Sequence, residues 1–585
     1  MDFLYSPDKP PASVHAVRRS NWHAKSPETN DFELEFADRT PLVPGRAADI
    51  GLLFRNKSGQ TPTGSLLILL PDKNLKDRST AELVQSDGAE AQWVYPVLEV
   101  ALPATSITLR NYPVPEQPEK FYLAAWHRRS DGRIFRLREI VRRVAGLPPE
   151  SLQIRLSSNV ANGVLRCSAA AEQPEAQHFM PAEECGDAFM LSGENGFTFS
   201  GRLRGGVWRG SMPLPAHRGG FSLKTVYCGK TTESNWIDPD FYELPGLTLV
   251  WGDLHVHSRE SDGLGAPEDL IHRARDWQNL DFLALNEHIE NSLAFRPWNR
   301  AKFAKLQALY DAVTQDGEFV MIGGFEYESF CNLWCFSHRY LDFLDPWINY
   351  DADCPIPEPG EPGFPEFEQK IWGEMARRAA DPEWLVGYHR LEVFHRTPDH
   401  LPPPVQLLQV AHYKRPPEIG AADFLNRGDR SGFFGSTDTH IGLPGMPFRG
   451  GRDGQSGLTA VLVDDLSRAG LHRALRARRC YATQGNRTLA DFRMNGALMG
   501  SECRVPRGEK LLFTVRAAGA EPIARMELVD RHGELAGSGC GGRKQFRWQW
   551  ETVQTEAWNC YFPRITLENG QRVWCSPIWV DAEEK

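Results

Sequence analysis

From residue 247 to about 490, apolar segments of strand length alternate with amphipathic segments of helical length, and this alternation constrains the fold most. It is typical of α/β domains, in which helices connect the strands of a parallel sheet or barrel. In PEDLIHRARDWQN, Pro267 suits the first turn of a helix, and Leu270, Ile271 and Ala274 recur at helical spacing. We therefore predict an α/β domain with a helix that begins at Pro267. Similar helical spacing occurs at 301–313, 370–381 and 467–479.

The sequence on both sides of this region is rich in β-like runs. Short apolar runs broken by Gly, Pro, Asn and Asp indicate antiparallel β-sandwiches before residue 247. After Arg493, the runs 510–518 and 524–533 predict separate strands of a terminal sandwich. The predicted organisation is an extended arm at 1–30, a β-sandwich-like domain at 31–145, a second β-rich segment at 146–246, an α/β domain at 247–492 and a β-sandwich at 493–585.

Charge and cysteine content limit the classes of partner and the compartment. The net charge of -10 argues against a general binder of nucleic acid or anionic membranes, which needs a basic face. The N-terminus lacks the pattern of a signal peptide, and no apolar run approaches the ~20 residues that span a bilayer. Eleven cysteines without a regular framework are typical of free thiols in a reducing cytosol. We predict a cytoplasmic protein with a small-molecule substrate, no nucleic acid and no membrane; the oligomeric state stays open.

Potential metal ligands stand at the ends of successive predicted strands. In a strand, residues i and i+2 project from the same face, so two histidines at that spacing can approach one ion. In α/β barrels, the carboxyl ends of the strands meet at one rim. Side chains that are far apart in the sequence would then line one pocket. These strand-end residues are His255, His257, His288, Glu326, His338, His389, Asp438 and His440.

These motifs resemble those of the PHP (polymerase and histidinol phosphatase) superfamily of metal-dependent hydrolases. The resemblance rests on the order of D-L-H-x-H-S with a following S-D-G turn, N-E-H, G-x-E, S-H-R and D-x-H. The LPG after the last histidine, ALRARRCYATQGNR (474–487) and the terminal WCSPIW are similar to a functionally uncharacterised bacterial branch. The resemblance implies a distorted (βα)7, TIM-like barrel flanked by β-sandwich domains on both sides, which holds two or three metal ions.

The resemblance also implies a ligand set for these ions. His395 or His412 lies near enough in the sequence to replace His389, and N-E-H stands where the family usually has T-D-H or T-E-H. The implied ligands are His255, His257, Asp262, His288, Glu326, His338, His389, Asp438 and His440.

Six imidazoles, three carboxylates and no thiolate suit Zn²⁺, Mn²⁺ or Fe²⁺ better than Mg²⁺ or Ca²⁺. Nine ligands are enough for two or three ions. Such ions lower the pKa of water to about 7, so that hydroxide forms at neutral pH without a serine or cysteine nucleophile. A separate zinc site at Cys331 and Cys335 is a less favoured hypothesis, because such a site needs a second pair of ligands that the sequence does not offer.

Three arginines beside the proposed ligands or in the following loop could bind an anionic substrate: Arg339, Arg390 and Arg449. They could equally pair with surface carboxylates. We predict catalytic roles for Asp438, His440 and Arg339. The favoured function is a phosphoesterase acting on a small molecule. The alternatives are hydrolysis of an amide, carbamate or ester on the same metal site, and a binding scaffold without activity.

Overall fold

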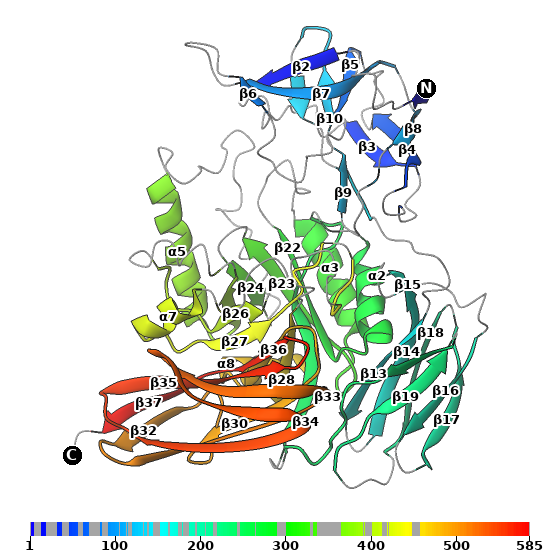
Figure 1. The fold of residues 1–585 in the computed structure, drawn as a ribbon. Helices are drawn as coiled ribbons and strands as arrows, with labels where there is room; N and C mark the ends of the chain where they lie inside the picture. The colour runs from blue at the N-terminus through cyan, green and yellow to red at the C-terminus, as the bar shows by residue number, and fades with distance from the viewer. Residues whose placement is uncertain are drawn as a thin grey trace.

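The computed structural model is built mainly from β-strands, which form several sheets (Figure 1). It describes the strands and some connections within residues 1–152, and most of residues 153–583. Beyond residue 152, the longest stretches outside this description are 180–186, 289–299, 336–363, 392–400, 412–417 and 447–456.

The first quarter of the chain holds two sheets that share one apolar cluster, together with a small strand pair. Leu52, Leu66 and Ile107 are buried in that cluster, so the two sheets pack against each other. The first sheet has the order β1 (Asp2–Leu4), β8 (Ser106–Tyr112), β4 (Ala48–Asn56) and β3 (Phe32–Phe36). The second has the order β11 (Ile134–Arg136), β10 (Ala125–Arg128), β5 (Ser65–Leu69), β7 (Gln92–Ala101) and β2 (Ser13–Arg18), with β6 (Glu82–Val84) against β7. The strand pair is β12 (Ile140–Arg143) with β9 (Lys120–Leu123).

Two more sheets follow, and they also share one core. Leu165, Phe189 and Leu223 are buried in it, from strands of both sheets. One sheet contains β13 (Gln153–Ala161), β14 (Val164–Gln173), β15 (His178–Phe179) and β18 (Val207–Pro213). The other has the order β17 (Thr198–Arg202), β16 (Ala188–Gly193), β19 (Leu223–Tyr227) and β20 (Lys230–Glu233).

The described strands from residue 248 onward form one continuous sheet of 17 strands. Its first eight strands carry the histidine motifs: β21 (Thr248–Val256), β22 (Phe282–His288), β23 (Val320–Tyr327), β24 (Cys331–Cys335), β25 (Trp384–Tyr388), β26 (Leu407–Ala411), β27 (Gly432–Gly435) and β28 (Leu458–Val463). Its other strands are β29 (Cys480–Thr483), β30 (Leu489–Met494), β31 (Ala497–Leu498), β32 (Glu502–Pro506), β33 (Lys510–Asp530), β34 (Gly533–Val553), β35 (Trp558–Leu567), β36 (Arg572–Cys575) and β37 (Ile578–Glu583).

Five α-helices lie in the described part of the chain: α2 (Pro267–His272), α3 (Arg300–Val313), α5 (Phe364–Ala380), α7 (Ala421–Arg427) and α8 (Arg468–Arg476). Four of them confirm helices predicted from the sequence. Pro267 occupies the start of α2, and the Asp269 carboxylate accepts a hydrogen bond from the Ala266 backbone N–H at 3.3 Å. Ser467 caps α8 by accepting a hydrogen bond from the Gly470 backbone N–H. A π-helical turn, Arg273–Trp277, follows α2 directly.

The predicted fold class, a distorted (βα)7 TIM-like barrel with flanking β-sandwiches, is wrong. A barrel of that class needs a helix after almost every strand, whereas the described residues hold 37 strands and five α-helices. The directions of the strands differ as well. Although β21, β22 and β23 are parallel, β24 runs antiparallel to both of its neighbours, and β28 runs antiparallel to β21. The protein is predominantly a β-sheet protein with a few helices.

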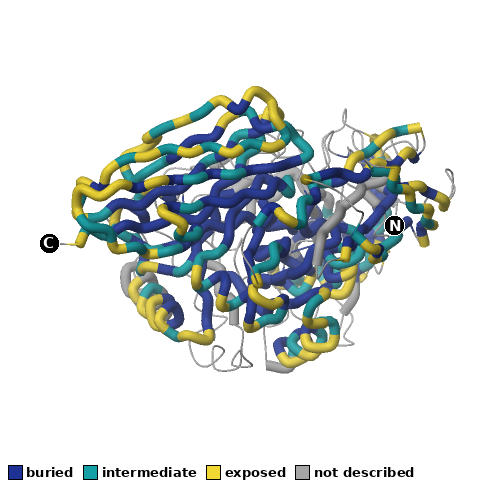
Figure 2. The backbone as a smooth tube through the Cα atoms, turned by 90° about the horizontal axis from the view of Figure 1, so that it is seen from below, coloured by how far each residue is buried: buried dark blue, intermediate teal, exposed yellow. Residues whose placement is uncertain are grey.

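Burial along the strands of the large sheet separates an apolar layer from a polar one. The strands at the centre of the tube drawing are buried along most of their length (Figure 2). Ala284 on β22 and Ile322 on β23 belong to one apolar cluster. Since side chains on a strand alternate between faces, His288 and Glu326, four residues further along each strand, lie on the same faces. The polar layer therefore lies next to the apolar cluster at the strand ends.

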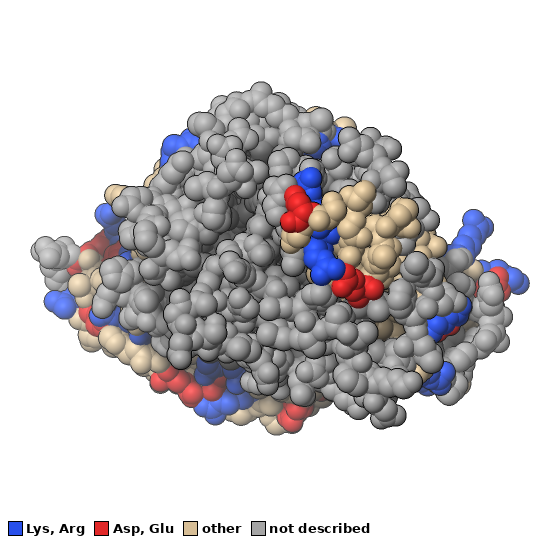
Figure 3. All heavy atoms as spheres, turned by 90° about the horizontal axis from the view of Figure 1, so that it is seen from above, with Lys and Arg blue, Asp and Glu red and all other residues tan. Residues whose placement is uncertain are grey.

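The surface carries charges of both signs. On the face drawn in Figure 3, several described Lys and Arg side chains lie beside Asp and Glu side chains. Opposite charges also form ion pairs at other described positions, such as Arg110 with Asp49 at 2.6 Å. Exposed pairs of this kind contribute little to stability.

Candidate metal centre

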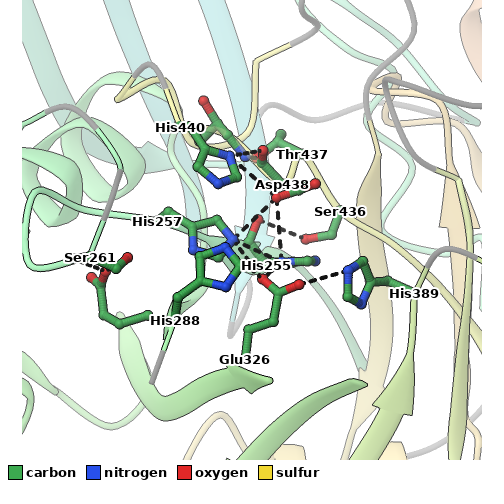
Figure 4. A network of polar contacts seen from close by, with 12 residues as sticks. His255, His257, Ser261, His288, Glu326, His389, Ser436, Thr437, Asp438 and His440 are labelled. Carbon is green, nitrogen blue, oxygen red and sulfur yellow. Dashed lines mark hydrogen bonds and ion pairs between the residues drawn. The ribbon is translucent and has the colours of Figure 1, made fainter. Parts of the chain in front are cut away.

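Seven buried histidine and carboxylate side chains meet where strands of the large sheet end (Figure 4). The strands bring them together from positions almost two hundred residues apart. His255 and His257 come from the end of β21, His288 from the end of β22, Glu326 from β23, His389 from the residue after β25, and Asp438 and His440 from the segment after β27.

Glu326 lies at the centre of the group. Its Oε2 is 2.8 Å from His255 Nε2 and 3.0 Å from His257 Nε2. The same oxygen is 3.6 Å from His288 Nε2, while Oε1 is 2.7 Å from His389 Nε2. One carboxylate therefore contacts four imidazoles and can bridge two positions, as a shared ligand would.

Asp438, in the segment that follows β27, contacts the same histidines. Its Oδ1 is 3.4 Å from His255 Nε2 and 3.2 Å from His257 Nε2. Asp438 has a φ of 47°, a left-handed conformation that aspartate tolerates better than most residues. His440 follows, and its ring stacks on that of His257 with centroids 4.1 Å apart. The left-handed turn brings both side chains of this segment to the centre.

The geometry fits a divalent cation. The Nε2 atoms of His255 and His257 are only 3.0 Å apart, and both face the same two carboxylate oxygens. Ligand atoms about 2.0–2.1 Å from a tetrahedral ion lie about 3.3 Å from one another, which agrees with contacts of 2.8–3.4 Å in this centre. A second group, formed by His257, His288 and His440, also has its ligand atoms within 4.8 Å of one another. Two overlapping groups suit two ions better than one.

Hydrogen bonds to backbone or amide oxygens indicate which nitrogen of two rings carries the proton. The Nδ1 of His440 lies 3.0 Å from the Asp438 backbone carbonyl, which can only accept, so Nδ1 carries the proton. In the same way, His255 Nδ1 donates to Gln409 Oε1 at 3.0 Å. The Nε2 atom of each neutral ring then has a lone pair available for a metal. Partners of this kind are typical behind metal-binding histidines.

The charges in this group perturb one another. Burial alone would raise the pKa of Glu326, but His389, His288 and His255 outweigh it and hold that pKa well below its usual range. Burial lowers the pKa of His257, but hydrogen bonds to Asp438 and Glu326 prevail and raise it to about 9. For His389, burial prevails and lowers the pKa to about 4. His389 is therefore neutral at pH 7, as a metal ligand must be.

Sequence reasoning missed three buried polar residues that support the ligands: Asp253, Glu287 and Gln409. Glu287 accepts hydrogen bonds from the Ser258 and Ser261 backbone N–H groups at 3.1 Å each, and so holds the turn after His257. Burial raises the pKa values of Asp253 and Glu287. All three carried a signal, because each is a polar residue within an apolar strand segment and two lie inside the histidine motifs.

Several predicted site residues lie outside the described residues, so their positions are not assigned: Asp262, His338, Arg339, Arg390, Arg449, and the alternative ligands His395 and His412. Cys331 and Cys335 belong to β24, and the structure describes only their backbone. The described centre consequently holds five imidazoles and two carboxylates of the nine ligands implied by the resemblance.

No family model matches the sequence, so membership of the PHP superfamily stays a prediction. The chain is 31% identical over 141 residues to an uncharacterised protein of Chlamydia muridarum (strain MoPn / Nigg), a match that covers 21% of this chain and 22% of the relative. A protein of Chlamydia trachomatis serovar D, also uncharacterised, matches with the same identity and coverage. The matched segment thus spans about a fifth of each relative's length.

Similar solved structures share little with this chain. The fibronectin(III)-like modules of Clostridium thermocellum CbhA cover 35% of it, with 93% of their own chain aligned, at 11% identity and a TM-score of 0.14. Escherichia coli alpha-2-macroglobulin covers 94% of it, with 44% of its own chain aligned, at 10% identity and a TM-score of 0.16. TM-scores this low carry no conclusion about fold or function. Among the described helices, none is both long and apolar enough to cross a membrane.

Proposed function

We propose that this chain is a metal-dependent hydrolase with a centre of two or three divalent transition metal ions, Zn²⁺, Mn²⁺ or Fe²⁺. The observation that carries the proposal is the convergence of His255, His257, Glu326 and Asp438. Their ligand atoms lie within 4.8 Å of one another, and all four side chains are buried. Burying so many ionisable groups is costly unless they pair or coordinate a metal, and a divalent cation satisfies all of them at once.

The residues around such a centre would have different roles. When bound, the ions would lower the pKa of water and stabilise negative charge on the substrate. His255, His257, Glu326 and Asp438 would hold one ion, and His288 and His440, which form the second group with His257, would contribute ligands to another. His389 contacts Oε1 of Glu326, whereas the histidines of β21 contact Oε2, so His389 would orient that carboxylate or join a ligand shell.

For the substrate, we propose a small molecule with a phosphoryl group. Two divalent ions bring four positive charges, and Glu326 and Asp438 return two negative ones, so the centre keeps a positive excess that favours an anion. Asp253 and Glu287 lie behind the ligands and reduce this excess wherever they are ionised. A carbonyl substrate, such as an amide, carbamate or ester, is therefore the second candidate.

The test is elemental analysis of the purified full chain, followed by assays on phosphomonoesters, phosphodiesters, amides, carbamates and esters with the same batch. We expect two to three equivalents of transition metal. His257→Ala should lose both metal and activity, while His532→Ala, at an exposed histidine, should lose neither. Wild-type protein that stays metal-free after addition of Zn²⁺ or Mn²⁺ would refute the proposal. Faster turnover of a carbonyl substrate would select the second candidate, and full metal without any turnover would favour a binding scaffold.

We also propose that the protein works in the cytoplasm. Cys480, Cys540, Cys560 and Cys575 are buried free thiols. Burial raises the pKa of Cys480 to about 12 and that of Cys560 to about 12, so these thiols are unreactive. Thiols of this kind need no oxidising compartment. Thiol titration of the denatured protein, purified without reductant, should recover all eleven cysteines; recovery of markedly fewer would contradict this placement.

A further inference from the structure

Asp253 lies on β21, two residues before His255, and its side chain is fully buried. Its carboxylate faces the segment that follows β27. There it accepts a hydrogen bond from the Thr437 backbone N–H at 3.1 Å and another from the Thr437 hydroxyl at 2.5 Å. The Gly445 backbone N–H donates to it at 2.9 Å, and the Ser436 hydroxyl donates as well. Four donors from one segment thus converge on one carboxylate.

These hydrogen bonds occupy the acceptor sites of both carboxylate oxygens. Oδ1 accepts from the Ser436 hydroxyl, from the Thr437 backbone N–H and, at 3.3 Å, from the His255 backbone N–H, and Oδ2 accepts from the Thr437 hydroxyl and the Gly445 backbone N–H. A carboxylate offers about four lone-pair sites. Asp253 therefore has no lone pair left for a metal, although its spacing from His255 matches that between His255 and His257. It also lies outside both groups of side chains that could hold an ion.

The segment that Asp253 holds carries two of the metal-site residues. Asp438 and His440 lie between the anchoring points at Thr437 and Gly445. Asp438 has a positive φ, which costs energy for a residue with a side chain and persists where the surroundings fix it. Anchoring on both sides of Asp438 supplies that constraint. The same strand carries His255, so the carboxylate links the two halves of the centre directly.

We propose that Asp253 is a positioning residue: by accepting hydrogen bonds from both ends of the 436–445 segment, it holds Asp438 and His440 against His255 and His257 and thereby sets the metal affinity of the centre. This inference rests on the proposed metal site. It assigns a role to the aspartate of the D-L-H-x-H motif that is distinct from coordination.

Two variants probe the link from its two ends. Asp253→Asn keeps the size of the side chain, but its amide nitrogen cannot accept the two hydrogen bonds made on one side. Ser436→Ala combined with Thr437→Val removes two donors and leaves β21 unchanged. Both should weaken Zn²⁺ binding by about 10–100-fold, the usual effect of losing a partner behind a metal ligand. If Asp253→Asn does not fold, the double variant still tests the link.

The matched control is Asp281→Asn, at another buried aspartate directly before β22. Asp281 pairs with Arg166 and accepts from the Trp251 backbone N–H at 2.8 Å, and it is not one of the acceptors that anchor Thr437 and Gly445. This variant should lower the midpoint of urea unfolding yet leave metal binding unchanged. A role in overall stability alone would make Asp253→Asn behave in the same way.

The readout is the visible absorption spectrum of the full chain titrated with Co²⁺, together with competition for Zn²⁺ against a chelator. We expect the spectrum to change in Asp253→Asn and in the double variant, because Asp438 and His440 shift relative to the ion. Unchanged spectra and affinities within twofold of wild type would overturn the inference while leaving the metal site intact. Wild-type protein that binds neither ion would instead overturn the proposed function and the inference with it.

Discussion

Replacement of Glu326 by glutamine is the sharpest perturbation of the centre, because the change keeps the size of the side chain and removes its charge. Glu326 contacts the Nε2 atoms of four histidines at 2.7–3.6 Å. An amide cannot bridge two cations as a carboxylate does. Loss of a partner behind a ligand costs about 10–100-fold in affinity, so loss of a bridging ligand should cost at least about 100-fold, or about 2.7 kcal/mol.

The assay is equilibrium dialysis of the full chain against chelator-buffered Zn²⁺, with metal measured by elemental analysis. Asp429→Asn serves as the control, since Asp429 is a buried carboxylate that pairs with Arg427 after α7. We expect Glu326→Gln to lose at least one equivalent of zinc at a free concentration that saturates both wild type and control. Full occupancy with affinity within twofold of wild type would show that Glu326 is not a ligand.

Three further predictions concern protons and stability. Asp438 and Glu326 raise the pKa of His257 to about 9, so Zn²⁺ binding at pH 7.5 should release about one proton from that ring. Calorimetry in buffers of different ionisation enthalpy measures this release. A binding enthalpy that does not depend on the buffer would contradict the prediction. Burial lowers the pKa of His472 from 6.5 to about 4, so folded protein resists its protonation and stability should fall as pH drops from about 6.5 toward 4. Because the His472 ring is partly exposed, solvent screens this effect, so the loss between pH 7.5 and 5 should be about 1 kcal/mol larger in wild type than in His472→Gln by urea unfolding; equal losses would count against it. Arg166→Met should lower the free energy of unfolding by about 3–5 kcal/mol, because it strips the buried Asp281 of its partner, whereas the exposed Arg202→Met should cost less than about 1 kcal/mol; similar costs for the two would refute this.

Helices were predictable because their signals are local. Pro267 and the spacing of the apolar residues after it define α2 without reference to the rest of the chain. Strand direction was not predictable in this way. The antiparallel pairing of β24 with β23 and β25 depends on how the chain returns across residues outside the strands. The prediction of a parallel barrel failed at that step.

The C-terminal region shows a second reason for the error. The runs 510–518 and 524–533 predict separate strands, and Gly519 and Pro522 lie between them. In the structure, β33 continues without a break from Lys510 to Asp530. Gly519 and Pro522 lie where the register of β33 against β34 shifts, between Ala518 and Ile523. A bulge accommodates Gly and Pro that would otherwise end a strand. Pairing with a long partner strand therefore overrode the local signal.

Alternation along β21 locates the candidate ligands but cannot separate their roles. Asp253, His255 and His257 are spaced by two, which predicts one shared face for all three. The structure has a shift of register between Asp253 and Val256. Asp253 accepts hydrogen bonds from Thr437 and Gly445, whereas the rings of the two histidines contact the carboxylates of Glu326 and Asp438. This shift can be seen only from the pairing of β21 with its neighbours. The spacing in the sequence therefore cannot distinguish the role of the aspartate from the roles of the two histidines.

The supports of the centre extend beyond the large sheet. Leu443 and Met446, at the end of the segment that carries His440, pack against Ala170 on β14. The Arg273 guanidinium donates to the Gly442 carbonyl at 2.6 Å, from the turn that follows α2. The segment is thus held by Asp253 on one side and by β14 and the turn on another. Because a left-handed Asp438 needs such constraint, the sheet that contains β14 contributes to the geometry of the centre although it supplies none of the described ligands.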